Sequence, residues 1–342
     1  MSKPLPILMF CALPASGKSE SRRYLKSLNK EQNAAIHLGD TQTQVDDYPY
    51  VDAMRKLDAF AQQTLGETIF FDPESTMFYS GYDWGTLMYM INDDYFDIKK
   101  CDSKVPEQFQ KDPAQWLFDR YDEAAVKTGK LEARFANLLK KYGAEKFAEF
   151  KKASHDLCAT ILREKYANIP ASLEGKTVVF EFARGGAKGS EFPLKEPYGY
   201  QYSLGLLDPE ILDNACILYI WVTPEQSYAK NLQRAKEGQE GKSQTVSTQL
   251  SLNHGVPHNV MVGEYGTDDV DYLLKVTEKQ NCFTITCQKD GKKHFVSVGR
   301  FDNRNDKTTP FRKPQSEWQP DEVKAMKDGM QEAFDQLLMH KK

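Results

Sequence analysis

A short stretch near the N-terminus constrains the fold most: an apolar run is followed, within a few residues, by Gly-Lys-Ser. The run at residues 7–11 predicts a buried strand, and the next eight residues read Ala-Leu-Pro-Ala-Ser-Gly-Lys-Ser. A helix-compatible stretch then covers residues 20–28 approximately. Strand, loop and helix in this order are typical of a phosphate-binding loop, and they predict that the chain binds a nucleoside triphosphate.

Each residue type in this loop has a physical task. Gly17 lets the backbone approach phosphate oxygens, Lys18 supplies a positive charge for the outer phosphates, and the Ser19 hydroxyl suits a magnesium ion. The positive end of the following helix adds to the attraction. The residues expected to contact the nucleotide are Pro14, Ala15, Ser16, Gly17, Lys18, Ser19 and Glu20.

Ala12 departs from the full motif, which has glycine at this position. Alanine can turn the chain out of the strand if its φ stays negative. The alternative is a chance Gly-Lys-Ser tripeptide at a helix start, but the preceding strand and the loop proline favour the phosphate-binding interpretation.

Composition limits the classes of partner. The 342 residues include 40% hydrophobic residues, enough for a sizeable core, and the net charge is −4 with scattered cations. This pattern argues against a general nucleic-acid binder and favours a small or anionic partner. The six cysteines show no paired metal-ligand spacing, and we expect reduced core cysteines in a cytoplasmic protein. Neither a signal peptide nor a membrane span is expected, and no oligomeric state is favoured.

The rest of the chain indicates an α/β fold whose mostly parallel sheet is flanked by helices. Four further apolar runs predict buried parallel strands, at residues 34–38, 177–182, 216–222 and 283–287. Helices are predicted at residues 51–65 and 224–236, and Asp290-Gly291 indicates a hairpin. Residues 68–71 are left open as an extra strand.

A large insertion separates the second and third of these strands. Residues 72–171 show apolar positions at helical spacing, and we expect a helical insertion whose apolar stripe faces the core. The whole chain is then a single domain, with residues 236–260 as a lid. The stripe comprises Leu131, Phe135, Leu138, Tyr142, Phe147, Phe150, Leu157, Ile161 and Tyr166.

Polar residues at two predicted strand ends are candidates for chemistry. Asp40 follows the run at 34–38, so we expect it to face the same crevice as Lys18 and to act as a general base. The alternative is a turn or N-cap aspartate. Asp46, Asp47 and Asp72 are further candidates for the base.

Glu181 stands inside the strand at 177–182, where an acidic residue suits a magnesium ion or its waters, and Arg184 follows where it could grip substrate or phosphate. A structural Glu181 would need a partner such as Arg184. Arg234, Lys236 and Lys242 precede or lie in the glycine-bearing lid, where cations could meet the charge that develops during transfer. The alternative for each is an exposed helix end.

Together these motifs resemble those of the P-loop kinases of small molecules and nucleotides. The families with the most similar motifs are adenylylsulfate kinases, zeta-toxin-type sugar-nucleotide kinases and the kinase domains of polynucleotide kinases. The resemblance implies that Asp40 is the base, that Arg234 is the lid arginine, and that Lys18 and Ser19 hold phosphate and magnesium. It covers the core only. Ala12, the absence of an arginine just after Asp40 and the large insertion depart from these families.

The sequence thus predicts a cytoplasmic kinase that moves the γ-phosphoryl group of ATP, with Mg²⁺, to a hydroxyl of a nucleoside, nucleotide or sugar-like acceptor. The alternatives are a polynucleotide 5′-hydroxyl kinase and an NTP-dependent switch; ATP is not distinguished from GTP. The insertion would form the acceptor pocket. Its candidate contacts are Tyr79, Tyr82, Asp83, Trp84 and Asn92.

Overall fold

The computed structural model describes residues 3–239 and 255–340, which form two compact units. One unit combines Met1–Gln44 with Gly175–Lys342, and the other is Val45–Glu174. The insertion predicted at 72–171 is therefore part of a larger unit, which also contains helix α3 (Tyr48–Thr64). Most of the predicted lid lies outside the described residues.

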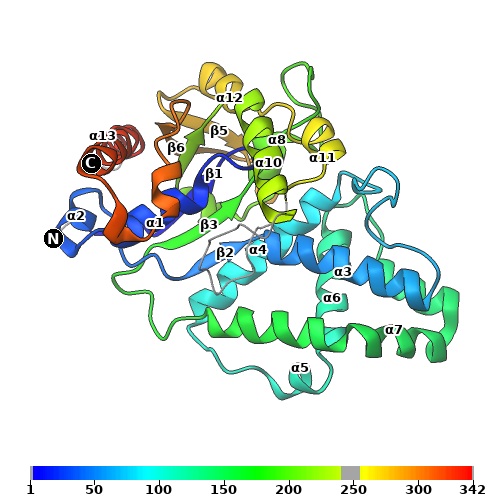
Figure 1. Ribbon diagram of the computed structural model, residues 1–342. Coiled ribbons are helices and arrows are strands. Elements are labelled where there is room, and N and C mark those ends of the chain that lie inside the picture. The colour runs from blue at the N-terminus through cyan, green and yellow to red at the C-terminus, as the bar shows by residue number, and fades with distance from the viewer. Residues whose placement is uncertain (1–2, 240–254, 341–342) are drawn as a thin grey trace. The chain divides into compact units, whose positions relative to one another are not determined.

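A six-stranded sheet organises the first unit, which contains five of its strands whole and the first residue, Gln44, of the edge strand β2 (Figure 1). Its spatial order is β2-β3-β1-β4-β6-β5, with β1, β3, β4 and β6 parallel and β5 antiparallel to β6. The fold is therefore α/β with a mostly parallel sheet, as predicted. The strands are β1 (Ile7–Cys11), β2 (Gln44–Asp46), β3 (Val178–Phe182), β4 (Ala215–Trp221), β5 (Cys282–Thr286) and β6 (Lys293–Asp302).

Three predicted strands are confirmed: β1 has the predicted bounds, and β3 and β4 match to within one residue. The strand predicted at 283–287 exists as β5 but is not parallel. It forms the antiparallel hairpin with β6 that Asp290-Gly291 indicates, and Gly291 has the positive φ of 69° that this turn requires.

The strand predicted at 34–38 was wrong. Residues 34 and 35 end helix α2 (Lys30–Ala35), which begins with a capping box between Asn29 and Gln32, and residues 36–38 form a turn and an irregular segment. The capping box and the two alanines favour a helix more strongly than the short apolar run favours a strand. Within that run only Ile36 and Leu38 are buried. The true second strand, β2, is three residues long and buries only Val45, so it gives no apolar signal.

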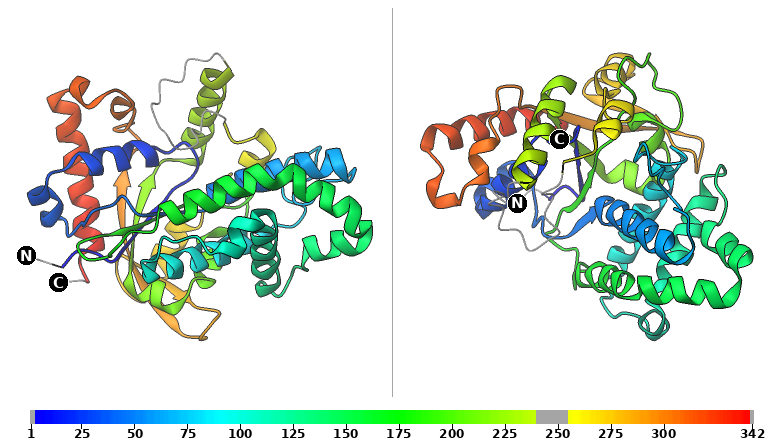
Figure 2. Two further views of the ribbon diagram at one scale, coloured as in Figure 1. Left: turned by 90° about the horizontal axis from the view of Figure 1, so that it is seen from below. Right: turned by 45° about the vertical axis from the view of Figure 1, so that its right-hand side comes forward.

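Helices α1 (Lys18–Ser27) and α13 (Pro320–Leu337) lie on one face of the sheet (Figure 2). Their apolar side chains, such as Leu25 and Phe334, share a core with Phe10 and Leu218. Among the described residues, no helix combines the length and apolar content that a membrane crossing needs. The unit also contains α8 (Gly199–Gly205), α9 (Pro209–Asn214), α10 (Pro224–Gln239), α11 (His258–Gly263), α12 (Val270–Val276) and the 3₁₀ turns η1 (Thr309–Arg312) and η2 (Gln315–Glu317).

The second unit is helical, as predicted for the insertion, and residues 68–71 contribute only an isolated bridge between Phe71 and Phe78. Rings of Phe118, Phe135 and Phe150 stack at its centre, with Phe118 and Phe135 centroids 4.1 Å apart. All nine residues of the predicted stripe are buried or partly buried. The helices are α3 (Tyr48–Thr64), α4 (Asp83–Lys100), α5 (Glu107–Lys111), α6 (Pro113–Lys127) and α7 (Arg134–Ala167).

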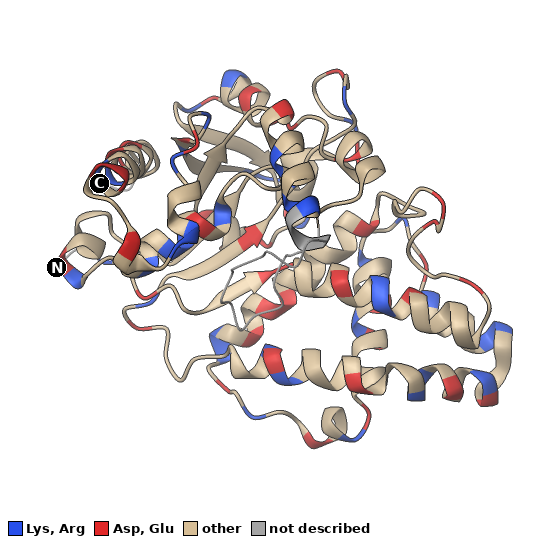
Figure 3. Ribbon diagram, viewed as in Figure 1, with Lys and Arg blue, Asp and Glu red and all other residues tan. Residues whose placement is uncertain are grey.

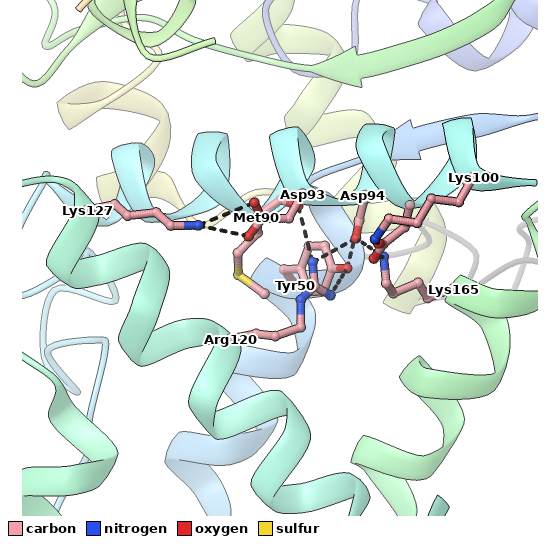
Figure 4. Close-up of polar contacts among 9 residues, drawn as sticks. Tyr50, Met90, Asp93, Asp94, Lys100, Arg120, Lys127 and Lys165 are labelled. Carbon is pink, nitrogen blue, oxygen red and sulfur yellow. Dashed lines mark hydrogen bonds and ion pairs between the residues drawn. The ribbon is translucent and has the colours of Figure 1, made fainter. Parts of the chain in front are cut away.

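Charged residues of both signs alternate along the helices of both units (Figure 3). One set in the second unit is buried: Asp94 of α4 accepts from Arg120 at 2.7 Å, from Lys165 at 2.6 Å and from the Tyr50 hydroxyl at 2.7 Å (Figure 4). Burial alone would raise the pKa of Asp94, but Lys165 and Arg120 outweigh it and lower that pKa to about 2. The cluster joins α3, α4, α6 and α7.

We expect Asp94→Ala to lower the free energy of unfolding by about 3–5 kcal/mol, because the buried Arg120 loses its carboxylate partner and the buried Lys165 keeps only Asp97. Asp93→Ala is the matched control: its partner Lys127 lies at 3.2 Å, both side chains are at least 40% exposed, and the loss should stay below about 1 kcal/mol. Urea unfolding at neutral pH measures both.

Equal losses in the two variants would contradict the role of the buried cluster. The pH dependence gives a second check. Because the pKa of Asp94 is lowered in the folded state, its contribution is present above the unfolded pKa of about 4 and is lost as the pH falls towards about 2. The difference between parent and Asp94→Ala should therefore shrink over that interval.

Candidate functional site

The loop between β1 and α1 has the backbone shape of an anion-binding nest. Ala15 and Gly17 both have positive φ, of 56° and 98°, and Gly17 caps the N-terminus of α1. A Cβ atom on Gly17 would lie 2.3 Å from the Thr308 hydroxyl, so the position requires glycine for both its conformation and its packing. The predicted strand, loop and helix are thus present in the expected order.

Side chains from distant parts of the chain bind the carbonyl oxygens of this loop. The Tyr200 hydroxyl donates to the Ala12 carbonyl at 3.3 Å, and the Ser227 hydroxyl donates to the Pro14 carbonyl at 2.7 Å. The amide of Asn303 donates to the Ser16 carbonyl at 2.8 Å. These bonds direct the loop oxygens into the protein.

The backbone N–H groups of residues 15–19, in contrast, have no hydrogen-bond acceptor within the described chain. They include the first N–H groups of α1, where the helix dipole is positive. Lys18 is partly exposed and Ser19 is exposed, so both side chains can reach a ligand at the loop. Unpaired donors, a cation and a helix N-terminus together suit a bound phosphate.

Glu20 does not fit its predicted place among the nucleotide contacts. Its side chain is buried and turned towards η1, where Oε1 accepts from Arg312 Nε at 2.9 Å. The carboxylate thus joins α1 to the C-terminal part of the unit.

Glu181 points to the face of the sheet that α1 covers, because it is aligned in register with Phe10. Its Oε2 atom accepts from Arg22 Nη1 at 2.8 Å and from Gln44 Nε2 at 3.3 Å. The partner that a buried carboxylate needs is therefore Arg22, one helical turn after Lys18, and not Arg184. Oε1 accepts no hydrogen bond from the described residues, so one oxygen is available to a ligand.

Arg184 was expected to grip substrate or phosphate, but it is only 2% exposed. Its guanidinium donates to the Ser203 hydroxyl at 3.0 Å and to the Ala183 carbonyl at 2.6 Å. These contacts anchor the end of β3 to α8. Arg234 lies partly exposed in α10, in its last described turns, whereas Lys242 lies outside the described residues.

The structure contradicts the expected position of Asp40. It forms a parallel bridge with Lys176, before the start of β3, whereas the phosphate loop follows Cys11, which is level with Phe182 at the end of β3. The two positions are six residues apart along the strand, or about 20 Å. Asp40 therefore lies at the amino edge of the sheet and Lys18 at the carboxyl edge.

The Asp40 carboxylate accepts from Lys176 Nζ at 2.8 Å and from the Gln42 N–H at 3.0 Å. The bond from Lys176 lowers the pKa of Asp40. Asp40 thus has the contacts of a turn aspartate, which the sequence analysis gave as the alternative to a general base. The predicted position of Asp40 was wrong because it assumed a strand at 34–38, which the structure does not contain.

Residues predicted to contact an acceptor are used in the core of the second unit. Asp83 is fully buried and receives two bonds from Arg134, at 2.5 and 2.7 Å. Trp84 is buried edge-on against Phe78, and Asn92 is 7% exposed. Of this set, Tyr79 and Tyr82 retain exposed surface.

Sequence reasoning missed Asn303 and Thr308, which support the loop from more than 280 positions away in the chain and belong to no local motif. It also missed Asp268, whose carboxylate accepts from the Tyr219 hydroxyl at 2.5 Å. Burial raises the pKa of Asp268 to about 7. Tyr219 is level with Cys11, so this carboxyl belongs to the same edge of the sheet as the loop. Its signal in the sequence, an Asp-Asp pair outside any strand, is weak.

We expect Asp40→Asn to change the free energy of unfolding by less than about 1 kcal/mol, because the pair with Lys176 is half-exposed and asparagine can still accept from Gln42. ATP affinity, measured by calorimetry, should not change. Gly17→Ala is the contrasting variant: the added Cβ meets Thr308, so binding at the loop should fall. A large loss of nucleotide affinity in Asp40→Asn would overturn this placement.

Comparisons with known proteins add no family to this description. No protein-family model, no curated protein and no solved structure matches the chain. The candidate site is therefore defined by its own geometry: a loop of unpaired N–H groups at the end of β1, with Lys18 and Ser19 beside it.

Proposed function

We propose that the loop at residues 12–19 binds the phosphates of a nucleoside triphosphate, and that the protein is a kinase that transfers the terminal phosphoryl group to a hydroxyl of a small polar acceptor. The unpaired N–H groups of residues 15–19 carry this proposal. A helix N-terminus alone leaves its first N–H groups unpaired. In this loop two residues with positive φ, Ala15 and Gly17, add unpaired N–H groups ahead of the helix.

Lys18 would neutralise the outer phosphates, since it is the first residue of α1 and directly follows Gly17 of the loop. Its charge acts on the Cys11 thiol at the end of β1, together with the charges of Arg184 and Asp268. Burial nevertheless dominates and raises the pKa of Cys11 to about 12, so this cysteine stays a thiol beneath the loop. Cys11 therefore adds no negative charge near Lys18.

Magnesium would be held between the Ser19 hydroxyl and the free oxygen of Glu181, directly or through water. The donor set fits, because both atoms are oxygens, as Mg²⁺ prefers, and Glu181 faces the helix that carries Ser19. When bound, the ion would neutralise charge on the transferring phosphoryl group. Arg22 fixes the carboxylate through Oε2 and leaves Oε1 to the ion or its water.

The acceptor is expected to be small, because a net charge of −4 with scattered cations argues against a nucleic-acid partner. The acceptor pocket in the second unit stays a prediction, and its acidic member Asp83 is already paired with Arg134. Asp40 is not proposed as the base. The function is tested by measuring ATP consumption with Mg²⁺, alone and with fractions of a metabolite extract. Turnover that requires one fraction identifies a kinase, whereas turnover without any acceptor indicates an NTP-dependent switch. Labelling of a 5′-hydroxyl oligonucleotide would favour the polynucleotide kinase.

We expect Lys18→Ala to weaken ATP binding by about 10- to 100-fold, which is the loss of one charge-assisted contact of roughly 1.5–3 kcal/mol. The melting temperature should hold, because Lys18 makes no hydrogen bond or ion pair within the described chain. Lys26→Ala removes the same charge two turns further along α1 and is the control. Calorimetry with equal affinity in parent and Lys18→Ala would refute the phosphate site.

We expect Glu181→Gln to raise the Mg²⁺ concentration needed for half-maximal turnover, because the amide keeps the shape but removes the charge. Metal-free nucleotide binding should change little. Arg22→Gln is the matched control, since it breaks the same ion pair and leaves the carboxylate in place. If both variants shift the Mg²⁺ titration equally, Glu181 acts through the ion pair and does not hold the metal.

A further inference from the structure

The hairpin of β5 and β6 brings three different metal-binding side chains together, at a distance from the phosphate loop. Cys287 directly follows β5, Asp290 lies in the turn, and His294 is the second residue of β6. One ligand atom of each, a sulfur, a carboxylate oxygen and a ring nitrogen, lie within 4.8 Å of one another. Within the described ranges this is the one such group of three.

Carboxylates lie at both ring nitrogens of His294. Its Nδ1 atom lies 2.7 Å from Asp213 Oδ1. Its Nε2 atom lies 3.3 and 3.4 Å from the two oxygens of Asp290. At Nε2, the ring and the Asp290 carboxylate can share either a proton, as an ion pair, or a metal ion.

The separation of the nitrogen and carboxylate ligands suits zinc, and the sulfur lies within 4.8 Å of both. Four ligands at about 2.0–2.3 Å from a tetrahedral Zn²⁺ are roughly 3.3–3.8 Å from one another, and the distance from Nε2 to Asp290 already lies in that range. Thiolate, imidazole and carboxylate are the three side-chain ligand types that zinc takes. Asp213 would be the outer carboxylate that orients a zinc-bound histidine through its other nitrogen.

The surroundings are those of a metal site in a hairpin turn. Cys287 is fully buried and His294 is 7% exposed, while Asp290 is exposed and leaves a path for the ion. The Asp290 carboxylate is already held by the Lys292 N–H at 2.9 Å, and Gly291 with positive φ closes the turn between them. The turn therefore holds the three ligands near one another before any ion binds.

We propose that Cys287, Asp290 and His294 bind a zinc ion. On binding, the Cys287 thiol loses its proton to solvent as the sulfur–zinc bond forms, and its contact with the Leu207 carbonyl is given up. Three protein ligands leave a fourth position for water. Because His294 lies beyond the amino end of β4 and the phosphate loop lies at the carboxyl end of the sheet, the ion would stabilise the hairpin and take no part in phosphoryl transfer.

The test uses the full chain, stripped with a chelator and titrated first with Zn²⁺ and then, in a separate sample, with Co²⁺. We expect one equivalent of zinc by elemental analysis, a higher melting temperature with zinc, and a thiolate-to-cobalt charge-transfer band with cobalt. Cys287→Ser should lose the charge-transfer band and the zinc-dependent rise in melting temperature. Cys282→Ser, in the same hairpin and equally buried, should keep both.

Asp290→Asn gives a second route to the same conclusion, because Asp290 is exposed and its replacement should leave the fold intact. It should weaken zinc binding by at least about tenfold while cobalt, at saturation, still shows the thiolate band. The proposal is overturned if the parent takes up no stoichiometric zinc, or if Cys287→Ser binds it as well as Cys282→Ser does. Far-ultraviolet circular dichroism of both cysteine variants serves as the check of folding, and it does not depend on the proposed nucleotide binding.

Discussion

Three side-chain hydrogen bonds to the carbonyl oxygens of the phosphate loop hold the geometry on which the candidate site depends. Tyr200, Ser227 and Asn303 reach the loop from α8, α10 and the segment after β6, so its shape depends on the completed sheet. The start of α8 is in turn fixed by Asp269, which accepts the N–H groups of residues 200 and 201. With the oxygens bound from behind, the N–H groups of the loop are left for an anion.

The two edges of the sheet carry different chemistry. At the carboxyl edge lie the phosphate loop, Glu181 and Asp268, where parallel strands end and ligands of α/β proteins are bound. At the amino edge lie the Asp40–Lys176 pair and the Cys287, Asp290 and His294 cluster. The described residues at the amino edge lie about 20 Å along the strands from the candidate site, so their side chains do not reach it.

Buried charge in the second unit is used for packing helices together. Asp83 and Asp94 are both bonded to arginines of neighbouring helices, and an unpaired carboxylate at either position would be costly. Aromatic rings of α6, α7 and the segment before α4 pack against one another in the same unit. Aspartate and aromatic residues, which the sequence suggested as ligand contacts, thus form the interior of this unit. An aspartate buried between helices is stable when an arginine pairs with it.

The sequence by itself determined the strand, loop and helix of the candidate phosphate site, the α/β class and the β5–β6 hairpin, because each depends on local patterns of apolar run, glycine and turn. It also indicated the core-facing stripe of α7. Tertiary structure alone decided that Asp40 lies at the far edge, since the strand that lies beside β3 is the short polar segment Gln44–Asp46, which begins after Asp40. It likewise decided that Glu181 pairs with Arg22 and that Asn303 supports the loop. Such contacts join residues more than 150 positions apart, and no local pattern encodes them.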